Sequence, residues 1–455
     1  MKNRPIVLGM AAAFAAFLSS HASAQEAPKP VAGLDKINHI IVLYLENRSF
    51  DNLYGLFPEA DGIANSGAAG IQVDRDGKPY AKLPPVLNTN FKPPIVDTRF
   101  PADLPNGPFR ADRYVGLEQV TGDAWHRYYQ EQLQIDDGKM DKYVAWTDAG
   151  GLVMGYFDGS PAPLWGYAKK YTLLDHFHHA AFGGSFLNHI FMICGCAPRY
   201  DGAPASLVAQ LDDKGGLVKD GAVTPDGYAV NTLFPVDGPH PAKINPDLLL
   251  PLQSNTTLGD RLDEKAIDWA WYSGGWNEAV AGRPGPLFQF HHQPFAYFAR
   301  YALGTPESKA HLRDEVDFIA GIERGELPAV VFFKPSGEDN EHPGYASVLA
   351  GEYHTALLVR LIERSPLWAD SLIIVTYDEN GGMWDHVAPP KTDRWGPGTR
   401  VPTLIISPFA KKGFIDHTVY DTTAIAKLIE TRFGLKPLGS RDAASGDLTT
   451  SLDLQ

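Results

Sequence analysis

Pairs of polar residues follow two separate apolar runs of the sequence, and their side chains are of the types that bind divalent cations. Glu46 and Asn47 come directly after one run, and Asp378 and Glu379 come directly after the other. If both runs are strands of one open α/β sheet, the four residues meet beyond the carboxyl ends of the strands, where such sheets bind ligands. Three carboxylates this close repel one another unless a cation or a proton lies between them, and their oxygens suit a hard or borderline ion. Either pair alone is more typical of a surface turn or a helix cap, but the recurrence at two strand ends predicts a metal site.

A serine at the start of a predicted helix is the candidate nucleophile. Ser185 follows Gly183 and Gly184 and precedes an apolar helical run at 186–193. Backbone N–H groups and the positive end of the helix dipole favour a phosphate group at such a position. A metal beside the hydroxyl would lower its pKa and activate it for attack. A serine that only caps the helix is the competing interpretation of this segment.

Four histidines are candidates to complete the site. His291 and His292 are adjacent, so both reach one site only if they lie on a turn rather than on a strand. His354 lies on a predicted helix with apolar residues at helical spacing and is therefore expected to face inward, and His126 lies near another predicted helix start. Each of the four, taken alone, is more typical of a structural histidine than of a catalytic one. A cluster that precedes the serine receives less weight: His176, His178 and His179.

The elements that must position these residues alternate between β and α patterns. Nearly continuous apolar runs, typical of strands buried on both faces of a parallel sheet, predict strands at 39–45, 267–272, 329–334, 372–377 and 403–407. Helices are predicted at about 115–133, 257–265, 347–363 and 422–433. The alternation predicts an α/β fold with a doubly wound, mostly parallel sheet sandwiched by helices. Two aperiodic Pro-rich and Gly-rich stretches, near 83–110 and 201–251, are predicted to be long loop insertions in a single domain at 25–455.

Composition limits the classes of protein to which the chain can belong. Residues 1–24 have a short basic start, an apolar run and a small-residue cleavage pattern, which predict a cleaved signal peptide and a periplasmic or secreted protein. Without Lys2 and Arg4 the chain keeps 38 of its 40 basic residues against 54 acidic ones, a net charge of −16, which argues against non-specific nucleic-acid binding. No later run predicts a transmembrane segment. The spacing of Cys194 and Cys196 is poor for a disulfide, and two buried structural cysteines are expected.

The motifs together resemble a known family. The runs Glu46-Asn47-Arg48-Ser49-Phe50-Asp51 and Thr376-Tyr377-Asp378-Glu379-Asn380-Gly381-Gly382-Met383-Trp384-Asp385-His386-Val387, with the Gly-Gly-Ser loop, are similar to the bacterial acid phosphatase and phospholipase C phosphoesterase family. The resemblance runs from about Asn38 to Arg432. It implies an alkaline-phosphatase-like core and one divalent cation, either Ca²⁺ or Zn²⁺. The implied metal ligands are Glu46, Asn47, Asp378 and Glu379, with Ser185 as a further ligand. The residues implied to surround the phosphoryl group are His126, His291, His292 and His354. Asp385 and His386 match the motif without an assigned role.

The resemblance also implies a reaction. Ser185 would attack phosphorus, a phosphoserine would form, one histidine would protonate the leaving alcohol, and water would then cleave the phosphoserine. Larger phospholipase C members carry additional C-terminal β domains, whereas this chain stops soon after its last predicted core helix. The first expectation is therefore an acid phosphatase acting on small phosphomonoesters, and the alternative is a phospholipase C or another phosphodiesterase acting on phospholipid head groups. A periplasmic binding protein for phosphorylated compounds is the distant alternative, because it would need neither a nucleophile nor strand-end carboxylates.

Overall fold

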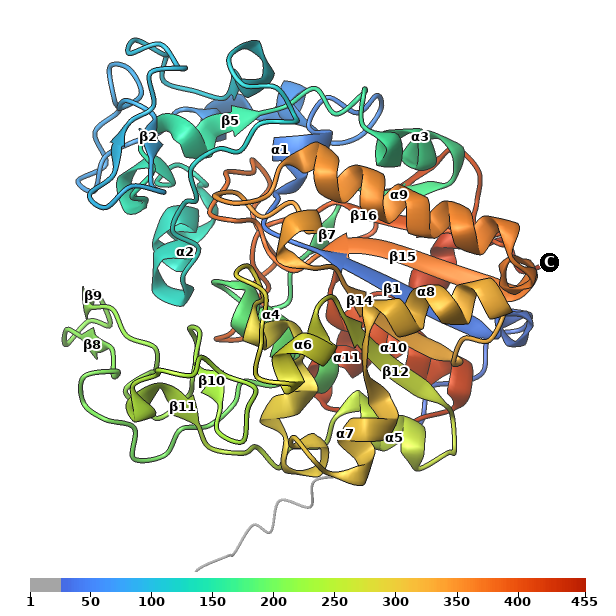
Figure 1. Cartoon of the computed structure of the whole chain (residues 1–455). Helices are drawn as coiled ribbons and strands as arrows, with labels where there is room; N and C mark the ends of the chain where they lie inside the picture. The colour runs from blue at the N-terminus through green and yellow to red at the C-terminus, as the bar shows by residue number, and fades with distance from the viewer. Residues whose placement is uncertain (1–25) are drawn as a thin grey trace, which may run out of the picture.

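The computed structural model describes residues 26–455, and its centre is an eight-stranded sheet (Figure 1). The predicted signal peptide at 1–24 lies outside the described residues. In spatial order the strands are β13 (Leu312–Asp314), β12 (Trp269–Ser273), β14 (Val330–Lys334), β1 (His39–Leu45), β15 (Ser371–Tyr377), β16 (Thr403–Ile406), β6 (Thr172–Leu174) and β17 (Phe414–Asp416). All neighbouring strands run parallel except at β16, which is antiparallel to both of its neighbours. All five predicted strands belong to this sheet.

The register of the three central strands determines which residues leave the sheet together. Leu45 of β1 lies opposite Tyr377 of β15, so the next residues, Glu46 and Asp378, emerge side by side. On the other side of β1, Leu43 lies opposite Phe333 of β14, which brings the last residue of that strand, Lys334, to the same edge. The strand interiors are buried on both faces, which accounts for their continuous apolar sequences. The register of the sheet therefore places two acidic side chains, Glu46 and Asp378, and the side chain of Lys334 at the same edge of the sheet.

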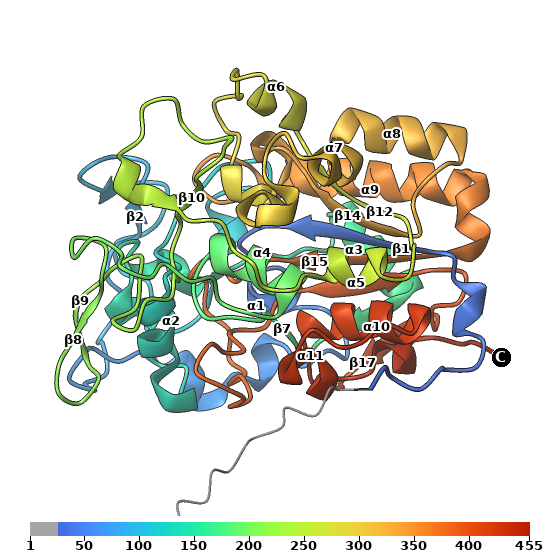
Figure 2. The ribbon, with the colours of Figure 1, turned by 90° about the horizontal axis from the view of Figure 1, so that it is seen from below.

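Helices cover both faces of the sheet. Figure 2 shows α8 and α9 on one face and α10 and α11 on the other, and α4 packs against α10. The helices are α1 (Phe50–Tyr54), α2 (Tyr128–Ile135), α3 (Pro163–Lys170), α4 (Ser185–Cys194), α5 (Leu258–Asp263), α6 (Trp276–Val280), α7 (Pro306–His311), α8 (Glu315–Arg324), α9 (Val348–Arg364), α10 (Thr423–Phe433) and α11 (Ser440–Ala444). The predicted α/β class with a mostly parallel sheet between helical layers is confirmed.

One predicted helix is wrong over more than half of its length. The expected helix at 115–133 begins only at Tyr128, and 115–127 has no regular helix. The segment instead lies beside 87–89: Asp123 N–H donates to the Thr89 hydroxyl oxygen at 2.7 Å, and the Thr89 hydroxyl donates to the Asp123 carbonyl. These tertiary contacts satisfy backbone groups that a helix would otherwise pair.

Irregular chain gathers at the end of the sheet toward which β1 points (Figure 2). It contains short strand pairs rather than further layers. The short strands are β2 (Leu87–Asn88), β3 (Ile95–Val96), β4 (Phe109–Arg110), β5 (Gly155–Tyr156), β7 (Phe177–His178), β8 (Gln210–Leu211), β9 (Leu217–Lys219), β10 (Phe234–Pro235), β11 (Leu249–Leu250) and β18 (Tyr420–Asp421). Of the helices that the structure describes, none is both long and apolar enough to cross a bilayer.

The expectation of two unpaired structural cysteines is wrong, because Cys194 and Cys196 form a disulfide. The intervening Gly195 has φ 57° and ends helix α4 in the left-handed conformation. That turn brings the two Cα atoms to 5.2 Å, which is within the usual range for a bridge. Spacing alone did not show that the helix would end between the two cysteines.

The buried side chain of Glu430, in helix α10, is expected to make the free energy of unfolding depend on pH. Burial, and next the neighbouring Asp442, raise the pKa of Glu430 to about 9 from its ordinary 4.5. The folded protein then keeps the proton while the unfolded chain loses it, so stability falls as pH rises from about 4.5 to about 9. Glu430→Gln keeps an acceptor for the Leu438 N–H. We expect it to match the parent at pH 4 and to be more stable by about 1–2 kcal/mol at pH 8, in thermal melts at both pH values. The exposed Glu323→Gln is the control, and an equal change at both pH values in Glu430→Gln would contradict the assignment.

Candidate active site

Glu46 is a buried acid at the carboxyl end of strand β1, and polar groups contact both of its oxygens. One oxygen, Oε2, accepts from the Asn340 amide at 3.1 Å and from the Tyr345 hydroxyl at 3.2 Å. The other oxygen, Oε1, forms ion pairs with His292 and with Lys334, whose Nζ lies at 3.1 Å. Burial would raise the pKa of Glu46, but the charges of His292 and Lys334 outweigh it and hold the pKa of that carboxyl well below its usual range. Glu46 is therefore a carboxylate.

Asp378 and Glu379 are fully buried beside it. Asp378 Oδ1 accepts the N–H groups of Asn47 at 3.1 Å and of Glu379 at 2.8 Å, which fixes the two strand ends to each other. Gly381, at φ 64°, lies so close to this junction that a Cβ there would be 2.4 Å from the Asn47 carbonyl oxygen. Burial, and next the Asp378 charge, raise the pKa of Glu379 well above its usual value. The negative charges of Asp378 and Glu379 thus repel each other, and a positive charge is needed nearby if both are to be ionised.

The donors fit a divalent cation. Three buried carboxylate oxygens accept no hydrogen bond: Asp378 Oδ2, Glu379 Oε1 and Glu46 Oε1, of which the last is in ion pairs with His292 and Lys334. Lys334 is the one Lys or Arg within ion-pair distance of these acids in residues 26–455. Unpartnered buried carboxylate oxygens are costly, and a cation between them removes that cost. Carboxylate and amide oxygens suit Ca²⁺, and the imidazoles beside them also suit Zn²⁺.

Ser185 lies next to this acidic group. It is the first residue of α4, and the preceding Gly184 is the capping residue. The Ser185 hydroxyl donates to the Asn47 Oδ1 at 3.3 Å instead of capping the helix. Asn47 itself has a positive φ of 61°, a conformation that is strained for a residue other than glycine and that is common at functional sites. Behind the serine loop, Glu131 accepts the Gly183 N–H at 2.6 Å and is paired with His179.

Two imidazoles flank the Asn47 amide. The Asn47 Nδ2 lies 3.0 Å from His342 Nε2 and 3.4 Å from His126 Nε2. In each histidine Nδ1 faces a nearby backbone carbonyl, that of Pro343 or of Ala124, which leaves Nε2 directed into the site. The predicted His126 is thus placed in the site, and His342 is a member that the sequence analysis missed.

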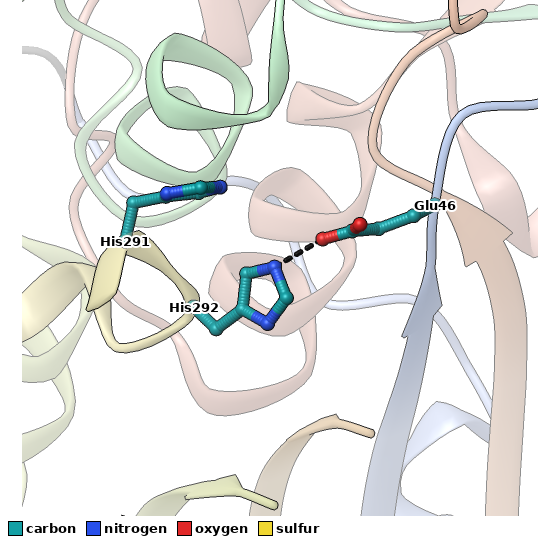
Figure 3. A group of neighbouring side chains, drawn as sticks. All are labelled: Glu46, His291 and His292. Carbon is teal, nitrogen blue, oxygen red and sulfur yellow. Dashed lines mark ion pairs between the residues drawn. The ribbon is translucent and has the colours of Figure 1, made fainter. Parts of the chain in front are cut away.

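The two adjacent histidines occupy one turn of 3₁₀ helix, η9 (Phe290–His292). Figure 3 shows both rings on the side of this turn that faces Glu46. The His292 ring stacks on His189, with ring centroids 5.3 Å apart, and the His291 ring lies edge-on to both. Burial, and next the charge of His292, hold the pKa of His291 well below its usual value, so its imidazole is neutral. His189 was also missed, and its Nδ1 is held by the Ser185 carbonyl at 2.7 Å.

His354 is not brought to this group. Its Nε2 pairs with Glu315 of helix α8 at 2.7 Å, and its ring packs against Phe333. The sequence pattern correctly predicts that α9 has a buried side, but part of that side faces a neighbouring helix and not the strand ends. His342, which the sequence analysis did not name, lies at Asn47 instead.

A cavity of about 300 Å³ opens onto the serine. Ser185 and the imidazoles of His126, His291 and His342 belong to its wall. Its remaining lining residues are Asp123, Arg127, Gly184, Phe186, Val230, Asn231, Thr232, Gln289 and Tyr345. The wall combines the hydroxyl of the candidate nucleophile with hydrogen-bond donors, and Asn47 links that hydroxyl to the buried carboxylates beside the cavity. This combination is suited to the displacement of a group from phosphorus.

Comparisons with known proteins identify relatives of this chain. The model of the phosphoesterase family matches residues 37–436. Phospholipase C A of Mycobacterium tuberculosis is 25% identical over 92% of this chain and 78% of its own length. Hemolytic phospholipase C of Pseudomonas aeruginosa is 24% identical over 93% of this chain and 56% of its own length.

Solved structures with a related arrangement are more distant. A protein in the alkaline phosphatase superfamily from Vibrio parahaemolyticus is 10% identical, with 64% of this chain and 65% of that chain covered and a TM-score of 0.35. The lipoteichoic acid synthase LtaP from Listeria monocytogenes is 9% identical, with 91% and 77% covered and a TM-score of 0.36.

Proposed function

Because this chain belongs to the phosphoesterase family, we propose that it is an exported, metal-dependent serine phosphodiesterase that cleaves phospholipids as a phospholipase C does. The observation that carries the proposal is the Ser185 hydroxyl, hydrogen-bonded to Asn47 between the buried acids and a cavity lined with imidazoles. The phospholipase C relatives favour a diester over the monoester that the sequence analysis placed first. Acid phosphatase activity stays as the second candidate, because a polar cavity of about 300 Å³ also suits a small monoester.

In the proposed reaction Ser185 Oγ attacks phosphorus, and its proton passes to an imidazole of the cavity wall, which then protonates the glycerol oxygen. The bond from phosphorus to the glycerol oxygen breaks, diacylglycerol departs, and a serine phosphoester that carries the head group remains. Water then attacks phosphorus, the bond to Ser185 Oγ breaks, and the phosphorylated head group is released. Each step conserves atoms and needs only water as co-substrate.

The chain supplies hydrogen bonds and proton transfer around phosphorus. His126 and His342 present Nε2 to the cavity, where they can hold phosphoryl oxygens or protonate the leaving alcohol. The neutral His291 ring can donate a hydrogen bond to a phosphoryl oxygen without adding charge. A divalent cation held by Glu46, Asn47, Asp378 and Glu379, with Ser185 beside it, would supply positive charge to the nucleophile and to the phosphoryl oxygens.

Substrate comparison tests the proposal. The purified protein is assayed with p-nitrophenyl phosphate, bis(p-nitrophenyl) phosphate and phosphatidylcholine in mixed micelles, each with and without a chelator. We expect diacylglycerol and phosphocholine as products, with kcat/KM at least about tenfold higher for the diesters than for the monoester, and loss of all activity on chelation.

The other outcomes are distinct. Hydrolysis of the monoester alone would support acid phosphatase. Full activity after metal removal would contradict the metal-dependent mechanism. No hydrolysis of any of the three after reloading with Ca²⁺ and with Zn²⁺ would overturn the assignment as a phosphodiesterase.

A further inference from the structure

Lys334 is a buried charged residue at the edge of the sheet to which the proposed reaction gives no function. It is the last residue of β14 and is completely buried, which is rare for a lysine unless its charge is paired. Its Nζ donates to the Leu45 carbonyl oxygen at 3.1 Å and lies 3.1 Å from Glu46 Oε1 and 3.7 Å from Asp378 Oδ2. The same atom lies 5.1 Å from the centroid of the Tyr44 ring. The ammonium group therefore bridges the ends of β1 and β15.

Imidazoles contact the same two carboxylate oxygens. Glu46 Oε1 pairs with His292 (Figure 3), and Asp378 Oδ2 lies 3.8 Å from His189 Nδ1. In two groups of three, the potential ligand atoms all lie within 4.8 Å of one another: Glu46, His189 and Asp378, and Glu46, His291 and His292. Carboxylates and imidazoles at such distances are a donor set that suits a divalent ion, Zn²⁺ in particular. Lys334 therefore places its charge where a metal ion would otherwise bind.

The balance of charges favours one metal ion beside this lysine. Glu46, Asp378 and Glu379 bring three carboxylates to one buried point, and Lys334 is the one Lys or Arg within ion-pair distance of any of them among the described residues. One positive charge from the ammonium and two from a divalent cation balance three carboxylates. Two divalent cations beside the ammonium would exceed that balance, and uncompensated buried charge is costly. Lys334 and one divalent ion are thus a complete set of counter-charges.

We propose that Lys334 is a positioning residue of the metal site, whose ammonium group occupies a second cation position and limits the site to one divalent ion. The inference rests on the metal site of the proposed function. Lys334 holds Glu46 and Asp378 in place, and Asp378 in turn accepts the backbone N–H of Asn47, whose side chain accepts the Ser185 hydroxyl. The single ion is thereby kept next to the nucleophile. In the competing arrangement two divalent ions bind and displace the lysine side chain from the acids.

A metal count made without substrate tests this role. The parent, Lys334→Met, Lys334→Arg and the exposed control Lys265→Met are stripped with a chelator, dialysed against Zn²⁺ and Ca²⁺ together, and analysed by mass spectrometry for bound metal. Lys334→Met is expected to hold two divalent ions, because methionine has a similar length but no charge. The parent, Lys334→Arg and the control are expected to hold one. A single ion in the arginine variant, which keeps the charge, separates this role from packing alone.

Thermal melts and a crystal structure give two further readouts. Saturating Zn²⁺ is expected to raise the Tm of Lys334→Met by about 3–6 °C more than that of the parent, because two ions instead of one bind the folded state. In crystals of the zinc-saturated parent, one anomalous peak at the zinc edge is expected among the acids, with Lys334 Nζ still at Glu46 Oε1. This second measurement does not depend on the folding of any variant. Two peaks among the acids, or a displaced lysine side chain, would overturn the proposal.

The metal count also distinguishes this inference from the proposed function. One ion in both the parent and Lys334→Met, or two ions in the parent or in Lys334→Arg, would overturn the role of Lys334 and leave a metal-dependent hydrolase in place. A parent that binds no ion would contradict the metal dependence and the role of Lys334 together. Failure to hydrolyse phospholipid would leave the count unchanged, because no substrate is present when it is made.

Discussion

Ser185→Ala is expected to lose at least about 10³-fold in kcat/KM for every phosphoester that the parent hydrolyses. The Ser185 hydroxyl belongs to the cavity wall and donates to a proposed metal ligand, the Asn47 Oδ1, at 3.3 Å. Removing it leaves the histidines and the acids in place but removes the atom that we propose attacks phosphorus. Steady-state rates with a monoester and a diester measure the loss, and an unchanged Tm shows that the fold is retained.

Two further measurements make this prediction specific. The exposed Ser254→Ala is the matched control and is expected to keep the parent rate. Acid quenching of the parent during turnover should trap a phosphoester on Ser185, which peptide mass spectrometry can locate, and the variant should show none. A Ser185→Ala protein that keeps more than about one tenth of the parent activity would rule out the serine mechanism.

The acids of the site could be predicted from sequence because register follows from simple patterns. Continuous apolar runs identify β1 and β15, and parallel neighbours end at the same edge of a sheet. Glu46 and Asp378 therefore converge as expected, and the pairing of Leu45 with Tyr377 is the physical reason. The same rule, applied to the predicted strand that ends at Lys334, would have drawn attention to the polar residues after it and so to His342.

Features that depend on the conformation of loops, or on contacts between distant segments, could not be predicted from the sequence pattern. The 3₁₀ turn at His291 and His292 and the left-handed Gly195 depend on local backbone conformation that no periodicity reveals. Helical spacing gives the buried face of α9 but not the element that covers it, which for His354 is helix α8. The contacts of Asp385 and His386 could not be predicted either, because their partners Asp51, Asp61 and Arg400 come from distant parts of the chain.

His342→Ala is expected to lower kcat/KM for phosphatidylcholine by about 10²–10³-fold, whereas His354→Ala should stay within about threefold of the parent. His342 directs Nε2 to Asn47 at 3.0 Å inside the cavity, but His354 is engaged by Glu315 at 2.7 Å outside it. The two variants remove the same side chain from the same protein, so the comparison separates catalysis from packing. His354→Ala is expected to change the Tm more than the rate, because it breaks a half-buried ion pair.

A comparison of substrates with different leaving groups distinguishes two possible functions of His342. If its imidazole protonates the departing alcohol, the loss should be large for a lipid, whose glycerol alkoxide is a poor leaving group, and below about tenfold for a p-nitrophenyl diester, whose phenolate needs no proton. An equal loss with both substrates would instead assign His342 to holding the phosphoryl oxygens, where charge is the same for either leaving group. Parent-like rates in His342→Ala would contradict a catalytic role for His342. A greater loss in His354→Ala than in His342→Ala would instead support His354, the histidine that the family resemblance implied.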